Sequence, residues 1–121
     1  MTHQCNHTLA STDRLITVDS YYEVASETDM MTYVLSTGPL SVCLDALSWS
    51  SYTGGIVKNC GREIDHCVQV VGLNADENYW IVRNSWGTDW GEHGYIYLEA
   101  GVDMCGIATT PTFAVVSKAS T

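Results

Sequence analysis

Basic residues are scarce in this sequence, and the shortage restricts the partners that the protein can bind. Its 121 residues include 5 Lys and Arg against 14 Asp and Glu, which gives a formal net charge of −9 at pH 7. Nucleic acids and anionic membranes bind surfaces rich in Lys and Arg, so we expect neither as a partner. Long apolar runs are missing as well, and none reaches the roughly 18 residues that a membrane-spanning helix needs.

The cysteines lack the spacing of a metal site. No Cys-X-X-Cys pair occurs among the 5 cysteines, and this pair is a common signature of a zinc site. We interpret His3 and His7 as solvated, and we expect no metal and no other cofactor. The odd number of cysteines predicts either a free thiol or a bonding partner that is absent from the sequence.

The first residues contain a glycosylation sequon but no pattern of a signal peptide. Asn6-His7-Thr8 is a sequon for N-glycosylation, which takes place only in the secretory pathway. Residues 1–7 have no apolar stretch and no basic flank, so they do not resemble a signal peptide. We therefore expect the chain to be a piece of a longer precursor.

Length and composition predict one globular domain. The chain has 45% hydrophobic and 16% charged residues, values typical of a folded protein with its own core. We expect a connecting segment at 1–13, the domain at 14–116 and a tail at 117–121. Many short apolar runs and one amphipathic stretch at 26–36 predict an α+β, mainly β fold. Its expected architecture is an antiparallel barrel-like sheet with one packed helix.

The expected elements have recognisable boundaries. Ser26 is the predicted N-cap of the helix, and Gly38-Pro39 ends it. The expected extended segments are 14–24, 40–45, 56–57, 64–73, 79–87, 95–98 and 107–116, the last interrupted at Pro111. We interpret Trp49, Trp80 and Trp90 as packing residues.

Two of these segments predict a hairpin that carries chemistry. The runs at 64–73 and 79–87 flank a polar cluster, Asn74 to Asn78, which is the pattern of an antiparallel hairpin. If the loop centres near Ala75 and Asp76, His66 lies opposite Asn84 or Ser85. A side-chain amide can accept the proton of one imidazole nitrogen and leave the other nitrogen free for proton transfer. The pair predicts half of a nucleophile–base–orienter site.

Several motifs in the same order resemble one enzyme family. They are Gly38-Pro39-Leu40-Ser41-Val42, Tyr52-Thr53-Gly54-Gly55-Ile56, Asp65-His66, Asn84-Ser85-Trp86-Gly87, Trp90-Gly91-Glu92-X-Gly94-Tyr95 and Cys105-Gly106-Ile107-Ala108. With them the chain resembles the C-terminal half of a papain-like, cathepsin-type cysteine peptidase, from about Cys5 to about Val116. The family's nucleophilic Cys, in a Gln…Cys-Gly-Ser-Cys-Trp segment, belongs to an N-terminal half that this sequence lacks.

The resemblance implies roles for individual residues. His66 would be the general acid and base for thiol-dependent peptide hydrolysis, Asn84 would orient its ring, Trp86 would shield that contact, and Asp65 would support it. Cys67 follows His66 directly, but neighbours on a strand point to opposite faces, so Cys67 is a poor nucleophile. We expect the chain on its own to be inactive.

The resemblance also implies roles for the cysteines and for a specificity pocket. Cys60 and Cys105 would form a disulfide, whereas Cys5 would lack its partner, and Cys43 and Cys67 would be free thiols. The expected wall of the pocket comprises Cys43, Ile64, Asp65, Cys67 and Thr110. Thr110 at the pocket floor predicts a preference for apolar or aromatic side chains over Arg. The alternative, that these are core residues of an isolated half, stays open.

The implied partners are the missing N-terminal half, peptide and protein substrates, and cystatin-like inhibitors. The implied location is a lysosome-like compartment or the cell exterior. We expect an exposed apolar patch around Trp86 and Cys43, with self-association of the isolated chain. The alternative function is a non-catalytic binding or regulatory domain that retained the half-fold. Erosion of Asp65-His66 or of Asn84-Ser85-Trp86-Gly87 would mark it, and both motifs are intact.

Overall fold

The computed structural model describes residues 16–118, and these fall into two compact units. Residues 23–113 form one unit, and the described part of the other comprises 16–22 and 114–118. The predicted connecting segment at 1–13, with Cys5 and the Asn6 sequon, lies outside the described residues, as does the end of the predicted tail. No described helix is long and apolar enough to cross a membrane.

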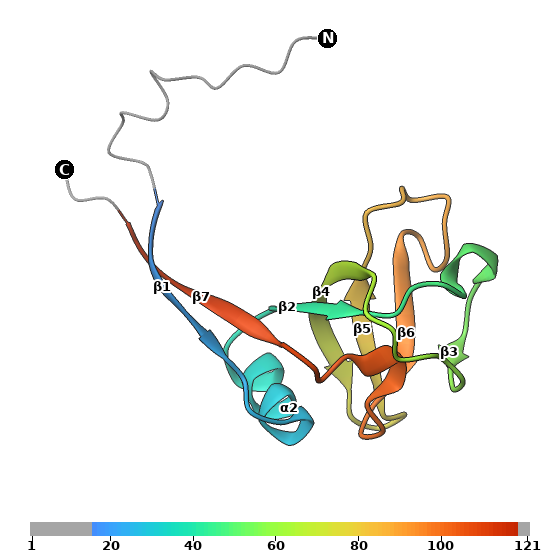
Figure 1. Cartoon of the computed structure of the whole chain (residues 1–121), viewed down its shortest axis with the longest axis horizontal. Coiled ribbons are helices and arrows are strands. Elements are labelled where there is room, and N and C mark those ends of the chain that lie inside the picture. The colour runs from blue at the N-terminus through green and yellow to red at the C-terminus, as the bar shows by residue number, and fades with distance from the viewer. Residues whose placement is uncertain (1–15, 119–121) are drawn as a thin grey trace, which may run out of the picture. The chain divides into compact units, whose positions relative to one another are not determined.

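The described residues form a seven-stranded sheet with one α-helix (Figure 1). The elements are β1 Ile16–Glu23, α2 Glu27–Ser36, β2 Leu40–Leu44, β3 Ile56–Val57, β4 His66–Asn74, β5 Tyr79–Arg83, β6 Tyr95–Glu99 and β7 Thr112–Lys118, with 3-10 turns η1 Trp49–Ser51 and η2 Met104–Gly106. The strand order is β1-β7-β2-β4-β5-β6-β3. This confirms the mainly β fold class, although β3 joins β6 in parallel.

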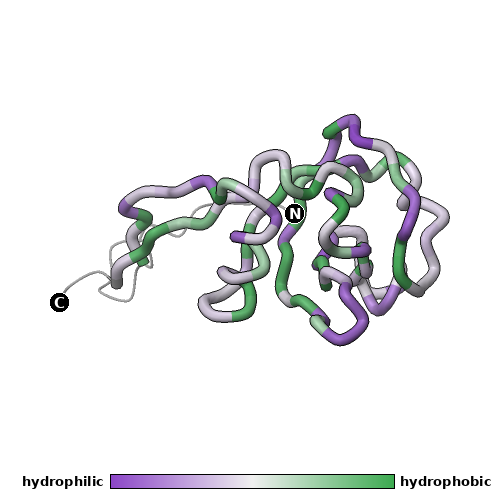
Figure 2. The backbone as a smooth tube through the Cα atoms, turned by 90° about the horizontal axis from the view of Figure 1, so that it is seen from below, coloured by the Kyte–Doolittle hydropathy of each residue, from purple (hydrophilic) through white to green (hydrophobic). Residues whose placement is uncertain are grey.

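The core lies on one face of the central strands. In β2, Leu40, Val42 and Leu44 are at most 1% exposed, while Ser41 between them is exposed. This alternation is that of a half-buried strand. Figure 2 shows stretches of hydrophobic residues along the chain, separated by turns with hydrophilic residues. The other fully buried side chains of the central strands are Val70, Trp80, Val82, Ile96 and Leu98.

The helix begins and ends as its sequence predicts. Ser26 is the N-cap, and its Oγ accepts a hydrogen bond from the backbone N–H of Asp29 at 3.1 Å. Met30 is fully buried and packs the helix against the core. Glu27, in the first turn, accepts three hydrogen bonds at 2.6 to 2.9 Å, from Trp80 Nε1 and from the backbone N–H groups of Gly101 and Asp103.

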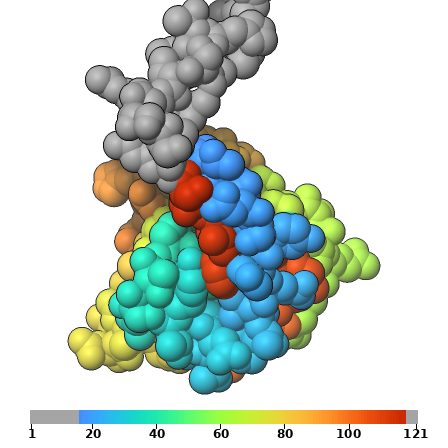
Figure 3. Space-filling view, turned by 90° about the vertical axis from the view of Figure 1, so that its left-hand side faces the viewer, coloured from blue at the N-terminus to red at the C-terminus, as the bar shows by residue number. Residues whose placement is uncertain are grey.

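The other unit is a pair of strands with little burial. β1 and β7 are neighbours in the sheet, and Figure 3 shows their atoms side by side. All eight residues of β1 are exposed, including Val18 at 66% and Tyr21 at 74%. The hydroxyl of Ser117 lies 3.2 Å from Oδ1 of Asp19 and ties the two strands together.

The register of the β4–β5 hairpin differs from the predicted one. Asn74 pairs with Tyr79, so the loop contains the four residues 75–78 and centres later than predicted. A bulge between Val70 and Gly72 shifts the pairing again. Gln69 therefore pairs with Arg83, and the backbone of His66 does not lie directly opposite Asn84. The two residues are instead diagonal neighbours on the same face, where side chains still reach one another.

Candidate active site

His66 and Asn84 lie at the ends of neighbouring strands and are joined by a hydrogen bond. His66 begins β4, and Asn84 directly follows β5. The Nε2 atom of His66 lies 2.8 Å from Oδ1 of Asn84. The backbone N–H of Ser85 donates to the same Oδ1 at 2.8 Å, so this atom is the acceptor. Nε2 of His66 therefore carries the proton, and Nδ1 is the basic nitrogen of the neutral ring.

Two tryptophans contact the imidazole of His66, and a third packs against both of them. Trp86 stacks on it, with ring centroids 5.3 Å apart and planes inclined by 29°. Trp49 meets it edge-on at 6.1 Å, and Trp90 contacts both Trp49 and Trp86. Asn84 is only 8% exposed among these groups. A hydrogen bond shielded from water is electrostatically stronger, so the rings favour a fixed orientation of the imidazole.

The contact of Trp49 with His66 is a feature that the sequence reading missed. The prediction gave Trp49 a packing role alone. The signal lies in the β2–β4 register, in which Leu44 pairs with His66. That pairing brings the turn after β2, and Trp49 with it, to the end of β4 that carries the imidazole. Trp49 is 1% exposed, and its Nε1 has no hydrogen-bond partner among the described residues.

The loop that carries Trp86 is closed by backbone hydrogen bonds. The N–H of Asn84 donates to the carbonyl of Gly94 at 3.1 Å, and the N–H of Gly94 donates to that of Trp90 at 2.7 Å. The indole Nε1 of Trp90 donates to the carbonyl of Trp49 at 2.9 Å. These contacts fix the loop in which Trp86 stacks on the imidazole and Trp90 packs behind it against Trp49 and Trp86.

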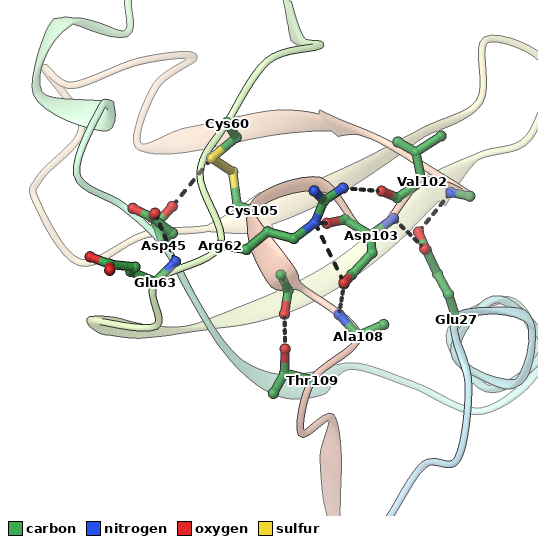
Figure 4. A network of polar contacts seen from close by, with 12 residues as sticks. Glu27, Asp45, Cys60, Arg62, Glu63, Val102, Asp103, Cys105, Ala108 and Thr109 are labelled. Atoms are coloured by element: carbon green, nitrogen blue, oxygen red, sulfur yellow. Dashed lines mark hydrogen bonds and ion pairs between the residues drawn. A yellow bond between two sulfur atoms is a disulfide. The ribbon is translucent and has the colours of Figure 1, made fainter.

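The carboxylates of Asp45 and Asp65 hold the backbone around the start of β4. Asp45 is 5% exposed, and it lies beside Glu63 in Figure 4. Between them the two carboxylates accept three hydrogen bonds at 2.8 to 3.0 Å, from the backbone N–H groups of Ala46, Leu47 and Glu63. The backbone N–H of Asp65 donates to the carbonyl of Leu44 at 3.0 Å. Asp65 thus acts on the position of His66 through the backbone.

The four described cysteines form two disulfides. Cys60 is bonded to Cys105, the pair that the resemblance implies (Figure 4). Cys43 is bonded to Cys67, with Cα atoms 3.9 Å apart, so the prediction of two free thiols at these positions is wrong. The reason is the register, because Cys43 and Cys67 are directly opposed in the antiparallel β2–β4 pair. Side chains opposed in this way are close enough to bridge.

One residue of the predicted pocket wall borders a hollow in the described structure, and the pocket itself stays a prediction. Cys43 and Cys67 are joined by their disulfide, and Cys67 borders an open hollow of about 510 Å³. The other residues that line this hollow are Ser41, Val68, Gln69, Arg83, Asn84 and Ser85. Ile64 is 43% exposed and Thr110 is also exposed, and neither borders the hollow.

Tyr52 lies beside this group of aromatic rings, and its hydroxyl accepts a hydrogen bond from the backbone N–H of Tyr97 at 3.3 Å. Tyr52 packs against Trp90 with ring centroids 5.5 Å apart. Burial raises the pKa of Tyr52 and of Tyr97 above the ordinary tyrosine value. Both therefore stay neutral over the pH range in which an imidazole exchanges protons. Among residues 16–118, no group of three or more His, Cys, Asp and Glu side chains is placed to hold a metal ion.

Comparisons with known proteins agree with this geometry. The sequence profile of the papain family cysteine proteases matches residues 1–115. The chain belongs to this family. Cathepsin O of Mus musculus is 40% identical over 111 residues, which are 87% of this chain and 36% of that protein. Cysteine proteinase 1 of Dictyostelium discoideum is 41% identical over 100 residues, which are 75% of this chain and 29% of that protein.

Solved structures of the papain family share the fold. The bromelain protease of Ananas comosus, solved with the inhibitor E64, superposes with a TM-score of 0.73 at 33% identity. The match covers 83% of this chain and 51% of the bromelain chain. Procathepsin L 3 from the midgut of Tenebrio molitor larvae gives a TM-score of 0.74, with 82% of this chain and 36% of that chain covered. The chain thus spans about a third of the curated relatives described above.

Proposed function

We propose that this chain is the C-terminal half of a papain-like cysteine endopeptidase and supplies its general acid and base. The observation that carries the proposal is the 2.8 Å hydrogen bond from His66 Nε2 to Asn84 Oδ1. This bond orients the ring and leaves Nδ1 free to exchange a proton with a reacting group. Trp86 stacks on the same ring, where we propose that it shields the bond from water, and Asp65 holds the backbone beside His66.

In the proposed reaction the nucleophile is a cysteine thiol of an N-terminal half. His66 Nδ1 takes the thiol proton, and the thiolate attacks the carbonyl carbon of the peptide. The C–N bond breaks as His66 returns that proton to the leaving amine, and a thioester remains. A water molecule then gives a proton to Nδ1 and attacks the thioester. The thiolate leaves, and the acid product is released.

The described part of the chain offers no nucleophile of its own. Cys43, Cys60, Cys67 and Cys105 are all held in disulfides. Cys67 would be a poor candidate even as a thiol, because it follows His66 on a strand and points to the opposite face. We therefore infer that peptide hydrolysis requires a thiol from the N-terminal half, which is the first partner of this chain.

The proposed substrate preference is for peptides with an apolar or aromatic side chain at the second residue before the scissile bond. The candidate wall contains Cys43, Ile64, Asp65, Cys67 and Thr110, and only Asp65 of these carries a charge. At the pocket floor an incoming guanidinium would meet the neutral Thr110 and no counter-charge, while the carboxylate of Asp65 already accepts a hydrogen bond from the backbone N–H of Ala46. Joining Cys43 to Cys67 makes this part of the wall more apolar than two thiols would, which adds to the same preference.

The proposed location is a lysosome-like compartment or the cell exterior. Two disulfides within residues 16–118 fit a protein that matures in an oxidising compartment. Similarity to cathepsin O supports the same route. Cystatin-like inhibitors are the proposed protein ligands of the assembled enzyme, because the resemblance implies the cleft that they block.

Intact mass after treatment with E64 tests the claim about the nucleophile. The Cys5→Ser variant of the chain is incubated with the inhibitor, with and without a thiol reductant. We expect no stoichiometric adduct under either condition. An adduct that forms rapidly on Cys43 or Cys67 in the reduced sample would place a nucleophile within these residues and overturn the proposed division of labour.

The same chain mixed with a papain-family N-terminal half separates the proposal from its alternative. Stoichiometric E64 modification of the added half, faster in the presence of the chain, supports the peptidase assignment. Binding of the two halves without faster modification would instead favour a non-catalytic binding or regulatory domain.

A further inference from the structure

We propose that the Cys43–Cys67 disulfide is a redox-sensitive bond that opens before Cys60–Cys105 and, on opening, loosens the strand end that carries His66. The bond joins β2 to β4 at directly opposed residues. The consequence for peptide hydrolysis rests on the proposed function, whereas the order of opening does not.

The bond lies one residue from the end of the β2–β4 ladder. Leu44 and His66 form the last pair, and Cys43 and Cys67 form the pair before it. The backbone of His66 is therefore held from two sides. On the Asp65 side two hydrogen bonds hold it, from Asp65 N–H to Leu44 O at 3.0 Å and from Ala46 N–H to Asp65 Oδ1 at 2.8 Å. On the Cys67 side the disulfide adds a covalent link to the pairing of β2 with β4.

This arrangement predicts a limited response when the bond opens. The hydrogen bonds of Asp65 remain, so the ladder end does not separate. The covalent tie on the other side is lost, and ladder ends are where local opening is easiest. We expect the His66–Asn84 hydrogen bond to break and reform more often while the fold is kept.

The two disulfides differ in access. Cys67 is exposed, Cys43 is half-buried, and Cys67 borders the open hollow of about 510 Å³. Cys105 is 0% exposed and Cys60 is half-buried. In Figure 4 the Cys60–Cys105 bond lies among the groups of the Asp45 and Asp103 network. Thiol–disulfide exchange requires a thiolate to reach a sulfur atom, so the Cys67 sulfur is the easier target.

The positive charge of Arg83 at the hollow also favours attack on Cys67. Arg83 borders the hollow together with Cys67, and it forms no ion pair with the described residues. The chain as a whole has a net charge of −9 and repels anions. A local guanidinium offsets that repulsion for an approaching thiolate, which raises the rate of exchange at Cys67.

The proposed reductant is a low-molecular-weight thiol, and the step balances with two of them. The first thiolate attacks Cys67 Sγ, the S–S bond breaks, and Cys43 leaves as a thiolate that takes up a proton. The second thiolate attacks the reductant sulfur of the mixed disulfide and releases Cys67, which is protonated in turn. Cys43 and Cys67 gain two electrons and two protons, and the two reductant molecules end as one disulfide.

Graded reduction of the Cys5→Ser chain tests the order of opening. The chain is exposed to increasing concentrations of reduced glutathione, trapped with iodoacetamide, and digested for mass spectrometry. We expect alkylation at Cys43 and Cys67 to proceed at least about tenfold faster than at Cys60 and Cys105, which serve as the internal control. Equal rates, or faster alkylation of Cys60 and Cys105, would overturn the proposal.

Exchange of the His66 Nε2 proton tests the coupling to the site. Nuclear magnetic resonance follows this proton in the oxidised chain, in the selectively reduced chain and in the Cys43→Ser/Cys67→Ser variant. We expect solvent exchange to be at least about threefold faster in the last two, with the fold retained. Unchanged exchange in both would refute the coupling. Neither readout needs peptide hydrolysis, so failure here is distinct from failure of the proposed function.

Discussion

At the scale of single residues, the state of His66 is set by what Asn84 can accept. Oδ1 of Asn84 receives both the Ser85 N–H and the Nε2–H of His66, each at 2.8 Å. An amide oxygen cannot donate a proton, so the tautomer of the neutral ring is fixed. Nδ2 of Asn84 has no hydrogen-bond partner among the described residues. Asn84 thus orients His66 through its side-chain oxygen alone.

Replacement of that oxygen gives the first prediction. In an assembled enzyme, Asn84→Ala should lower kcat/KM about 100-fold, because a free imidazole spends little time in the productive orientation. KM should change little, since the substrate does not contact Asn84 in the proposed mechanism. Steady-state kinetics on a fluorogenic peptide measure both. Ser85→Ala is the matched control, because its backbone N–H is retained, and a loss of similar size there would contradict the role of Asn84.

At the scale of elements, α2 is attached to the turn after β6 through one carboxylate. Glu27 is partly buried and accepts from Trp80 Nε1 at 2.9 Å, from Gly101 N–H at 2.6 Å and from Asp103 N–H at 2.8 Å. Trp80 is fully buried, and its indole N–H donates to Glu27, so removal of Glu27 takes away the hydrogen-bond acceptor of a buried donor. An unpaired buried donor is costly, which makes Glu27 a structural anchor.

Glu27→Ala should therefore lower the free energy of unfolding by about 2 to 4 kcal/mol. Glu27→Gln should lower it by less, because the amide retains one acceptor oxygen. Urea denaturation followed by tryptophan fluorescence measures the difference. Glu77→Ala, at an exposed position in the β4–β5 loop, should change the value by less than about 0.5 kcal/mol. A Glu27→Ala loss no larger than that of Glu77→Ala would show that the anchor contributes nothing.

The tyrosines beside the aromatic group predict a dependence of stability on alkaline pH. Burial raises the pKa of Tyr52 and Tyr97, so the folded state holds these protons to higher pH than the unfolded state. Their contribution is complete below the ordinary tyrosine pKa of about 10 and is lost as pH rises through the folded-state value. Urea midpoints should fall above about pH 10. The fall should be smaller in Tyr52→Phe, and an equal fall would contradict the assignment to Tyr52.

The helix and the strands show which features of the fold could be predicted from the sequence. The cap at Ser26 and the alternation in β2 depend on neighbouring residues, and both were predictable. The β4–β5 register depends on a four-residue loop and on a bulge at Val71, neither of which has a distinct sequence signal. The Cys43–Cys67 bond requires the pairing of β2 with β4, which are far apart in the chain. Local sequence signals thus predicted the helix and strands, whereas the strand register and the Cys43–Cys67 disulfide became known only from the structure.

At the scale of the whole molecule, the proposed function makes the chain one side of a two-part site. The His66–Asn84 pair is assembled within residues 23–113, and every described cysteine is held in a disulfide. Trp86 remains 43% exposed although it covers the imidazole. An exposed aromatic surface of this kind next to the His66–Asn84 pair is what the proposed partner half would cover.

The isolated chain should consequently self-associate. At high concentration, light scattering should give a mean mass well above the 13.3 kDa of one chain. Trp86→Gln should lower that mass, whereas Trp80→Phe, a change in the buried core, should not. A monomer at all concentrations would show that the exposed surface around Trp86 and Cys43 needs no cover.

The most direct measurement is peptide hydrolysis by the chain combined with a papain-family N-terminal half that carries the cysteine. Hydrolysis should require both parts. It should fall by at least about 100-fold in His66→Ala. It should stay unchanged in His93→Asn, a loop histidine with positive φ that Asn also tolerates. Full activity in His66→Ala would contradict the assignment of His66 as the acid and base.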